Sequence, residues 1–237
     1  MIPWLGPGDP FPPVEAAVRE PNGLLAAGAD LSEARLLDAY RRGIFPWFNE
    51  DEPVLWWSPD PRMVLDVRAV HVSRSLRKVI RSGRFTVTFD RAFEDVMRAC
   101  AEPRPGQDGT WITGEMLDAY TRLAADGHAH SVEAWQQGEL AGGLYGVSIG
   151  RMFFGESMFA RRSDASKVAL VSLACQLRAW GFRLIDCQMS TPHLASLGAR
   201  DVPRARFLAE VADLVQQPSP PSPWRLDVDV AASLEAG

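Results

Sequence analysis

The residues with the clearest chemical potential lie in a short apolar segment, residues 184–188, whose pattern predicts a strand. Because side chains alternate along a strand, Asp186 and Gln188 are expected to share one face, with Ile185 and Cys187 on the other. A carboxylate in such a strand is costly to bury unless it is paired or used. Asp186 is therefore either a structural residue bonded to a neighbouring loop or a functional group beside Gln188.

Cys187 is a further candidate in this strand, because a cysteine can act as a nucleophile. Its alternation with polar neighbours instead favours a buried, structural side chain. The three cysteines, Cys100, Cys175 and Cys187, have the spacing of neither a disulfide framework nor a zinc site. No metal is expected, and this cysteine usage is typical of a reducing cytosol.

A second candidate group lies in residues 155–159, at the end of another predicted strand. Glu156 and Met158 are expected to share a face, with Phe153 opposite, and Ser157 can donate a hydrogen bond. Taken alone, Glu156 is more typical of a solvated charge at a strand edge than of a catalytic group.

Large aromatic residues gather near predicted turns rather than along helical stripes, namely Trp47, Phe48, Trp56, Trp57, Trp111 and Tyr120. Such side chains can stack on an unpaired base at the end of a nucleic acid. Core packing is the alternative, and it is the more common use of an aromatic residue. Trp47, Trp111 and Tyr120 are the candidates for substrate contact.

Four basic residues, Arg74, Arg77, Lys78 and Arg81, fall within a predicted helix near residues 71–84. The whole chain carries a net charge of −5 and has a pI near 5.4, which counts against indiscriminate nucleic-acid binding but permits a local basic patch. The four side chains are expected either to contact nucleic-acid phosphates or to form a solvated helix face.

The elements that position these residues can be expected from length and periodicity. The chain has 237 residues, 46% of them hydrophobic, which is enough for one large domain or two small ones. We expect a small N-terminal domain over residues 1–62 and a main domain over residues 63–237 that ends in a Pro/Ser-rich tail. No apolar run is long enough to span a bilayer, and the N-terminus does not have the pattern of a signal peptide.

Within these domains, turn residues and hydrophobic spacing predict the individual elements. Helices are expected at about 31–42, 91–100, 113–126, 165–180 and 203–217, and strands at 63–73, 85–89, 130–135, 140–148, 151–159 and 182–189. Pro53, Pro59 and Pro61 are expected to exclude regular structure around residues 55–62. Three hairpin-spaced strands, a helix and one more strand predict an α+β fold with a mostly antiparallel sheet, like the centre of an N-acetyltransferase.

The loop between the third of these strands and the next helix discriminates between acyl donors. In N-acetyltransferases that use acyl-CoA, a glycine-rich loop at this helix N-terminus cradles the pyrophosphate. Residues 160–167 contain no glycine, and Asp164 adds a negative charge where a diphosphate would approach. The acyl donor is therefore predicted not to be CoA. Arg161, Arg162 and Lys167 are expected either to be solvated or to meet nucleic-acid phosphates from the outer side of the loop.

At these residues the chain resembles the bacterial leucyl/phenylalanyl-tRNA–protein transferases. The matching segments occur in the family's order: Arg19–Leu25, Arg42–Trp47, Leu55–Arg62, Gly109–Thr113, Gly127–Ser131, Gly155–Phe159, Ala165–Lys167, and Leu184–Gln188 followed by Ala195–Ala199. No single segment is decisive, but this many in order are highly specific. The Pro/Ser-rich tail lies outside the resemblance.

The resemblance implies transfer of Leu or Phe, and Met less well, from aminoacyl-tRNA to proteins that start with Arg or Lys. The modified proteins become substrates of N-end rule degradation. It also implies a small N-terminal domain beside a GNAT-like (N-acetyltransferase-like) C-terminal domain. No cofactor is expected. The expected partners are aminoacyl-tRNA and acceptor proteins, and the protein is expected to be a cytoplasmic monomer that does not associate with membranes.

For the site, the resemblance implies that Asp186 and Gln188 are catalytic. In one alternative, Asp186 draws on Gln188, whose side-chain oxygen accepts a proton from the attacking amine. In the other, Asp186 faces the acceptor amine, the two residues orient it and stabilise its charge, and a hydroxyl of the tRNA's terminal ribose shuttles the proton. The second is favoured because an amide oxygen is a very weak base. Glu156 is expected near the donor site, where it pairs with the acceptor's basic side chain or fixes the terminal adenosine.

The remaining expected contacts concern the donor. Leu144, Phe153 and Ile185 are expected to line a pocket for the Leu or Phe side chain, and Trp47 and Trp111 to stack on the terminal adenosine. Ser157 and Tyr120 complete the expected substrate-binding set, and Arg74, Arg77, Lys78 and Arg81 the expected tRNA phosphate contacts. Two rival functions are a CoA-dependent N-acetyltransferase and a non-catalytic tRNA-binding module.

Overall fold

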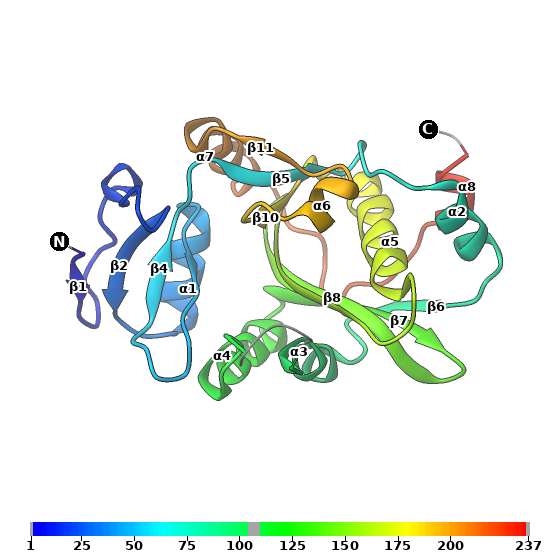
Figure 1. Cartoon of the computed structure of the whole chain (residues 1–237), viewed down its shortest axis with the longest axis horizontal. Coiled ribbons are helices and arrows are strands. Elements are labelled where there is room, and N and C mark those ends of the chain that lie inside the picture. Colours follow the sequence, from blue (N-terminus) through cyan, green and yellow to red (C-terminus); the bar gives the residue numbers. More distant parts are fainter. Residues whose placement is uncertain (1, 104–109, 236–237) are drawn as a thin grey trace.

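The molecule is built on two separate β-sheets. The structure is a computed structural model that describes residues 2–103 and 110–235. Figure 1 shows a smaller unit at the N-terminal end, in blue, beside a larger unit that contains the rest of the chain. The combination of helices with two sheets is the mixed α+β architecture that the sequence predicts.

The smaller unit holds a four-stranded sheet in the order β1-β2-β4-β3. Its elements are β1 (Trp4–Leu5), the 3₁₀ turn η1 (Val14–Ala16), β2 (Leu24–Gly28), α1 (Glu33–Arg41), β3 (Phe45–Pro46) and β4 (Leu55–Trp57). Strand β4 contradicts the expectation that prolines exclude regular structure around residues 55–62. Pro53 and Pro59 lie just outside this strand, so neither removes a hydrogen-bond donor from its ladder.

The larger unit holds a seven-stranded sheet in the order β11-β5-β10-β9-β8-β7-β6. Its strands are β5 (Arg62–Asp66), β6 (Thr86–Phe89), β7 (Ala129–Gln136), β8 (Glu139–Ile149), β9 (Met152–Ala160), β10 (Leu184–Gln188) and β11 (Arg200–Val202). Neighbouring strands are antiparallel except β9 and β10, which run parallel. The expected strand over residues 63–73 is shorter than predicted, because the chain turns after Asp66, whose carbonyl accepts from Ala69 N.

Helices cover both faces of this sheet (Figure 1). Helix α5 (Ala165–Ala179) packs on one face, and α3 (Phe93–Ala101) with α4 (Gly114–Ala125) packs on the other. Helix α5 is buried almost all round, because residues 168–177 contain no charged side chain. The cluster on the α3–α4 face also includes Leu36 and Tyr40 of α1, so the smaller unit shares a core with the larger one.

The remaining helices are α2 (Arg74–Arg81), α6 (Pro192–Ser196), α7 (Arg204–Leu214) and α8 (Val230–Ser233). The Pro/Ser-rich tail is packed rather than loose. Trp224 is buried and stacks on His130, with ring centroids 3.7 Å apart, and its backbone N–H donates to Asp90 at 2.7 Å. In the part of the chain that the structure describes, no helix has both the length and the apolar character needed to cross a membrane.

Candidate active site

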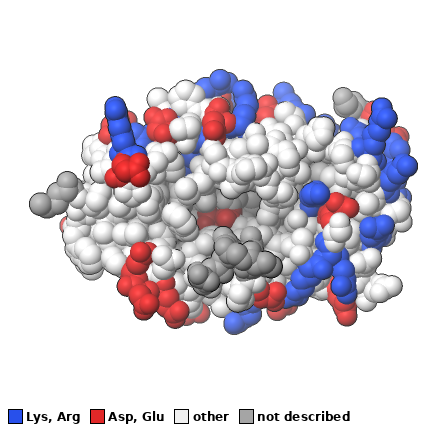
Figure 2. Space-filling view, viewed as in Figure 1, with Lys and Arg blue, Asp and Glu red and all other residues white. Residues whose placement is uncertain are grey.

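An apolar cavity of about 420 Å³ lies where β3 of the smaller unit approaches β8, β9, β10, α5 and α6. Its walls are lined by Phe45, Trp47, Trp111, Leu144, Phe153, Met158, Leu170, Leu173, Ile185 and Leu194, among others. Figure 2 shows this side of the molecule hollowed at its centre, with an acidic group at the floor and mostly uncharged atoms around it. A cavity of this kind holds an apolar group and orients it with a few polar ones.

The polar floor is supplied by β9 and β10, which lie side by side. Each strand carries a bulge at the site. On β9 the pairing jumps from Gly155 to Ser157, which leaves Glu156 as the extra residue. On β10 it jumps from Asp186 to Gln188, which leaves Cys187 as the extra residue. A bulge re-aims the side chains around it, and here the two bulges bring Glu156 and Gln188 together.

Glycine makes the β9 bulge possible. Gly146 of β8 pairs with Gly155 beside the extra residue. A Cβ atom at Gly146 would lie 2.3 Å from the carbonyl oxygen of Phe154, closer than real atoms approach. Any larger residue at position 146 would therefore push β8 away from the bulged strand.

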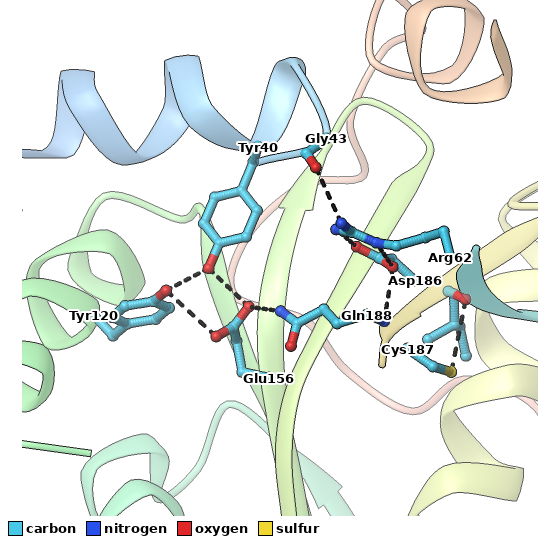
Figure 3. A network of polar contacts seen from close by, with 9 residues as sticks. Tyr40, Gly43, Arg62, Tyr120, Glu156, Asp186, Cys187 and Gln188 are labelled. Atoms are coloured by element: carbon cyan, nitrogen blue, oxygen red, sulfur yellow. Dashed lines mark hydrogen bonds and ion pairs between the residues drawn. The ribbon is translucent and has the colours of Figure 1, made fainter. Parts of the chain in front are cut away.

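Glu156 is the centre of a hydrogen-bond network at the floor of the cavity (Figure 3). Its Oε1 accepts from the hydroxyl of Tyr40 at 2.7 Å and from Gln188 Nε2 at 2.8 Å, and its Oε2 lies 3.4 Å from the hydroxyl of Tyr120. The two phenols also hydrogen-bond to each other. Tyr40 comes from α1, Tyr120 from α4 and Gln188 from β10, so three parts of the chain converge on the carboxylate of Glu156.

This setting gives Glu156 an unusual ionisation. Burial raises the pKa of Glu156 to about 7, and the hydrogen bond from Tyr40 opposes part of that shift. Burial also raises the pKa values of Tyr40 and Tyr120 well above 10, so both remain neutral donors. A carboxylate that gains and loses a proton near neutral pH has the ionisation suited to general acid–base chemistry.

Asp186 lines the cavity as a paired carboxylate rather than an open one, which argues against the expectation that it meets the acceptor amine. Its side chain is fully buried, and both oxygens are bound by Arg62, at 2.8 Å from Nε and 2.7 Å from Nη2. Oδ1 also accepts from the backbone N–H of Gln188 at 2.9 Å. Asp186 is one of the residues that line the cavity, but both of its oxygens are already bound by Arg62.

Cys187 also lines the cavity. Burial raises the pKa of its thiol, with a further rise from the charge of Asp186. Because the thiolate is the nucleophilic form, this environment disfavours a nucleophilic role.

The structure brings most of the expected site residues together. Asp186, Gln188, Glu156, Ser157, Trp47, Trp111, Leu144, Phe153 and Ile185 all line the cavity. Tyr120 does not line it, and it reaches the site only through Glu156 and Tyr40. Strict alternation fails at both bulges, so Ile185, Asp186, Cys187 and Gln188 all border the same space.

The basic residues lie elsewhere. Arg74, Arg77, Lys78 and Arg81 belong to α2, which does not line the cavity and packs beside α8 near the C-terminus (Figure 1). Two of them are engaged by the tail: Arg77 donates to the carbonyl of Leu234, and Arg81 pairs with Glu235 at 2.9 Å. Arg74 and Lys78 have no ionic partner within residues 2–103 and 110–235.

Several site residues were missed from the sequence. Arg62 and Tyr40 are buried and bind the carboxylates of Asp186 and Glu156, and the cavity wall also includes Met158, Leu170, Leu173, Thr191, His193 and Leu194. The sequence does point to Arg62, because this charged residue directly precedes the apolar run Met63–Leu65. A charge placed there demands a buried partner. Within the described residues, no group of three His, Cys, Asp or Glu side chains is placed to hold a metal ion.

Known proteins resemble this chain along most of its length. The sequence model of the family described as leucyl/phenylalanyl-tRNA protein transferase matches residues 64–212, and that of its N-terminal domain matches residues 29–60. Curated relatives that carry the name leucyl/phenylalanyl-tRNA–protein transferase include the following two. The protein from Thiobacillus denitrificans is 63% identical over 217 residues, covering 92% of this chain and 95% of its own. That from Chromobacterium violaceum is 61% identical over 224 residues, covering 94% and 96%.

Similarity to solved structures is weak. L-PGS from Bacillus licheniformis matches with a TM-score of 0.39 and 11% identity, covering 68% of this chain and 52% of that chain, which is too distant to inform the argument. The family model covers more than half of the sequence, and the two relatives cover nearly all of it. On this ground the chain is a member of the leucyl/phenylalanyl-tRNA–protein transferase family.

Proposed function

We propose that this protein transfers Leu or Phe, and Met less well, from aminoacyl-tRNA to the N-terminal Arg or Lys of acceptor proteins, which marks them for N-end rule degradation. The observation that carries the proposal is the apolar cavity whose floor holds Glu156 and Gln188, in a member of this family. The substrate partners are aminoacyl-tRNA and the acceptor protein, and we propose a cytoplasmic monomer.

The cavity suits the donor's amino acid. Leu144, Phe153 and Ile185 give it an apolar wall, and its volume of about 420 Å³ is in the range of small-molecule pockets. Trp47 stands at the rim with 39% of its surface exposed, and Trp111 lines the same cavity. We assign these two rings to stacking on the terminal adenosine of the tRNA, because base–aromatic stacking needs an accessible ring.

The acceptor amine is assigned to Gln188 and Glu156. Gln188 donates through Nε2 to Glu156, so its side-chain oxygen, which carries no bond in Figure 3, is available to accept from the amine. The amine nitrogen forms a bond to the ester carbonyl carbon, and the bond from that carbon to the ribose oxygen breaks. Glu156 takes the proton released by the amine and returns it, directly or through a ribose hydroxyl, to the leaving oxygen.

In this scheme Asp186 positions Gln188 and accepts no proton itself. The paired state of its carboxylate argues against Asp186 as the group that meets the amine. The scheme also removes the need for an amide oxygen to act as a base, because Glu156 supplies a group that titrates near neutral pH.

The segment before α5 supports tRNA rather than CoA as the carrier. Asp164 occupies the N-cap position of this helix and pairs with Lys167 at 3.2 Å. Arg161 pairs with Glu102, and Arg162 lies 3.5 Å from Glu139. With an acid at the helix N-terminus and each base already paired, the segment is poorly suited to bind a pyrophosphate.

The GNAT-like character of the larger unit is also a proposal. It is supported by the succession of an antiparallel meander, β7 to β9, then α5, then a strand, β10, that returns parallel to β9. We place the domain boundary between residues 62 and 63. Arg62 is the last residue before this boundary and also the first residue of β5 in the large sheet, so it joins the two units.

A transfer assay tests the proposed function. Radiolabelled Leu-tRNA is mixed with the protein and a peptide that starts with Arg, and a peptide that starts with Asp serves as the control. Label should enter only the Arg peptide. Binding of charged and uncharged tRNA alike, with no labelled peptide, would support a non-catalytic tRNA-binding module. A rise in melting temperature with acetyl-CoA would support an N-acetyltransferase.

Changing Leu144 to Ala is expected to raise the preference for Phe over Leu as the donor by roughly tenfold, because the vacated space is filled by a phenyl ring but not by a leucyl group. The ratio of kcat/KM values for Phe-tRNA and Leu-tRNA measures this. Leu123→Ala is the matched control, since Leu123 is buried in α4 away from the cavity. It should lower stability and leave the ratio unchanged. An unchanged ratio in Leu144→Ala would remove this residue from the donor pocket.

On α2, removing the charges of Arg74 and Lys78 is expected to weaken tRNA binding more than removing the charges of the two arginines that the tail contacts. Arg74→Gln with Lys78→Gln should lower affinity and reduce the slope of log affinity against log salt by roughly 1 to 2. The matched pair, Arg77→Gln with Arg81→Gln, should change the slope little, because those side chains already contact Leu234 and Glu235. Equal slopes for the two pairs would show that contact with the tail does not determine which side chains of α2 bind tRNA.

A further inference from the structure

Arg62 is fully buried at the junction of the two units and contacts four residues from three segments of the chain. Its guanidinium lies between the rings of Phe45 and Phe207, with its central carbon 4.7 Å from each ring centroid. Two of its nitrogens bind the two oxygens of Asp186, and Nη1 donates to the carbonyl of Gly43 at 3.1 Å. Figure 3 shows this guanidinium between the carbonyl of Gly43 and the carboxylate of Asp186.

The effect of Arg62 extends through Asp186 to Gln188. Asp186 Oδ1 accepts both from Arg62 Nε and from the backbone N–H of Gln188. Gln188 has a φ of +61°, in the left-handed region that residues with a side chain rarely adopt. Such a conformation costs about 1–3 kcal/mol and persists only when its surroundings impose it. The fixed carboxylate of Asp186 supplies that constraint.

The conformation of Gln188 decides where its side chain goes. In a regular strand, the residue two positions after Asp186 would point to the same face as Asp186. The bulge and the left-handed backbone instead turn Gln188 toward the cavity, where Nε2 meets Glu156 Oε1 at 2.8 Å. A small rotation of Asp186 would therefore move the group assigned to the acceptor amine.

We propose that Arg62 is a positioning residue for aminoacyl transfer, which fixes the orientation of Asp186 and, through it, the backbone and side chain of Gln188. The inference rests on the proposed function. It also means that the smaller unit completes the site, because the carbonyl of Gly43 and the ring of Phe45 hold the guanidinium in place.

The geometry of the pair favours positioning over stability. A buried ion pair contributes little net stability, and an apolar pair of similar size often replaces it without loss. Two parallel N–H···O bonds, however, define both the distance and the angle of a carboxylate. An apolar pair would preserve packing here but would offer no acceptor to the N–H of Gln188.

This contrast supplies the experiment. The double variant Arg62→Met with Asp186→Val removes both charges and keeps apolar volume. Single-turnover transfer from Leu-tRNA to an Arg peptide is measured with enzyme in excess, so that the rate constant reports the folded molecules and the amplitude their fraction. The double variant should recover much of the melting temperature lost in Arg62→Met, while its rate constant stays roughly 100-fold below that of the unchanged protein. The KM for tRNA should change little.

Two further variants keep the result decisive. Arg62→Lys retains the charge but not the paired bonds, and it should also lower the rate constant more than the amplitude. Arg35→Met is the matched control, because Arg35 is a buried arginine that stacks on Phe11 and donates to a backbone carbonyl away from the cavity. It should lower the melting temperature and leave the rate constant unchanged.

The outcomes are separable. If the unchanged protein transfers no leucine, the proposed function itself is wrong. If it does, and either the double variant or Arg62→Lys keeps a rate constant within about threefold of it, Arg62 is only structural and the inference is overturned. Should the double variant yield no folded protein, the Arg62→Lys rate constant decides between the two.

Discussion

Replacing Glu156 by Gln is expected to make the protein more stable at pH 8 while removing most of its transfer activity. Burial raises the pKa of Glu156 to about 7 in the folded protein, whereas an unfolded chain titrates this group near 4.3. Between these values the folded state binds more protons than the unfolded state. Stability therefore falls as pH rises, and the loss is complete above pH 7.

Glutamine removes this cost and keeps the local bonds. Its oxygen can still accept from Tyr40 and Gln188, and its amide nitrogen can donate to Tyr120. The expected gain in unfolding free energy at pH 8 is roughly 1–2 kcal/mol, less than the full pKa difference implies because the side chain is partly exposed to the cavity. Near pH 5 the two proteins should differ little. Urea unfolding at the two pH values measures this gain.

The loss of activity should be about 100-fold or more, the usual contribution of a general base. Glu133→Gln is the matched control. Glu133 is buried in β7, burial raises its pKa, and it accepts from Ser131 and Thr88, but it does not line the cavity. This control should transfer leucine normally. A Glu156→Gln protein that is less stable at pH 8, or fully active, would contradict the assignment of Glu156.

Replacing Asp186 by Asn is expected to cost about 3–5 kcal/mol of unfolding free energy, because Arg62 is left buried without a counter-charge. Both side chains are fully buried, so the unpaired guanidinium would have little access to solvent. A second variant, Asp38→Asn, removes the partner of Arg42 in an exposed pair with side chains 41% and 48% exposed. That change should cost less than about 1 kcal/mol.

Chemical denaturation of the two variants measures the contrast. Transfer should also fall in Asp186→Asn, through kcat rather than through the KM for the acceptor, since Asp186 does not contact the amine in the proposed scheme. A selective rise in the acceptor KM with unchanged stability would instead restore Asp186 as the group that faces the amine.

Much of the larger unit was predictable because its signals are local. Gln137 and Gly138, and Gly150 further on, are turn residues between alternating segments, and they correctly separate β7, β8 and β9. The helix expected at about 165–180 is confirmed as α5, and its uncharged run of residues 168–177 is buried. In the smaller unit, β1 and β3 have only two residues each, too few to show a period.

The site was only partly predictable, because its key features depend on partners far away in sequence. Alternation placed Asp186 and Gln188 on one face, but the bulge at Cys187 is set by pairing with β5. Arg62 lies 124 positions before Asp186, and nothing near either residue specifies the other. Tyr40 looks like any apolar-face residue of α1 until the fold brings Glu156 to its hydroxyl.

The pH dependence of single-turnover leucyl transfer tests the role of Glu156 most directly. Rates are measured from pH 6 to pH 9 for the unchanged protein and for Glu156→Gln, with a saturating Arg peptide. Because the ionised carboxylate is the active form, the unchanged protein should gain rate with a midpoint near pH 7. The variant should be slow and lack that step, keeping only the rise from the acceptor amine near pH 8. The same step near pH 7 in both proteins would show that another group takes the proton.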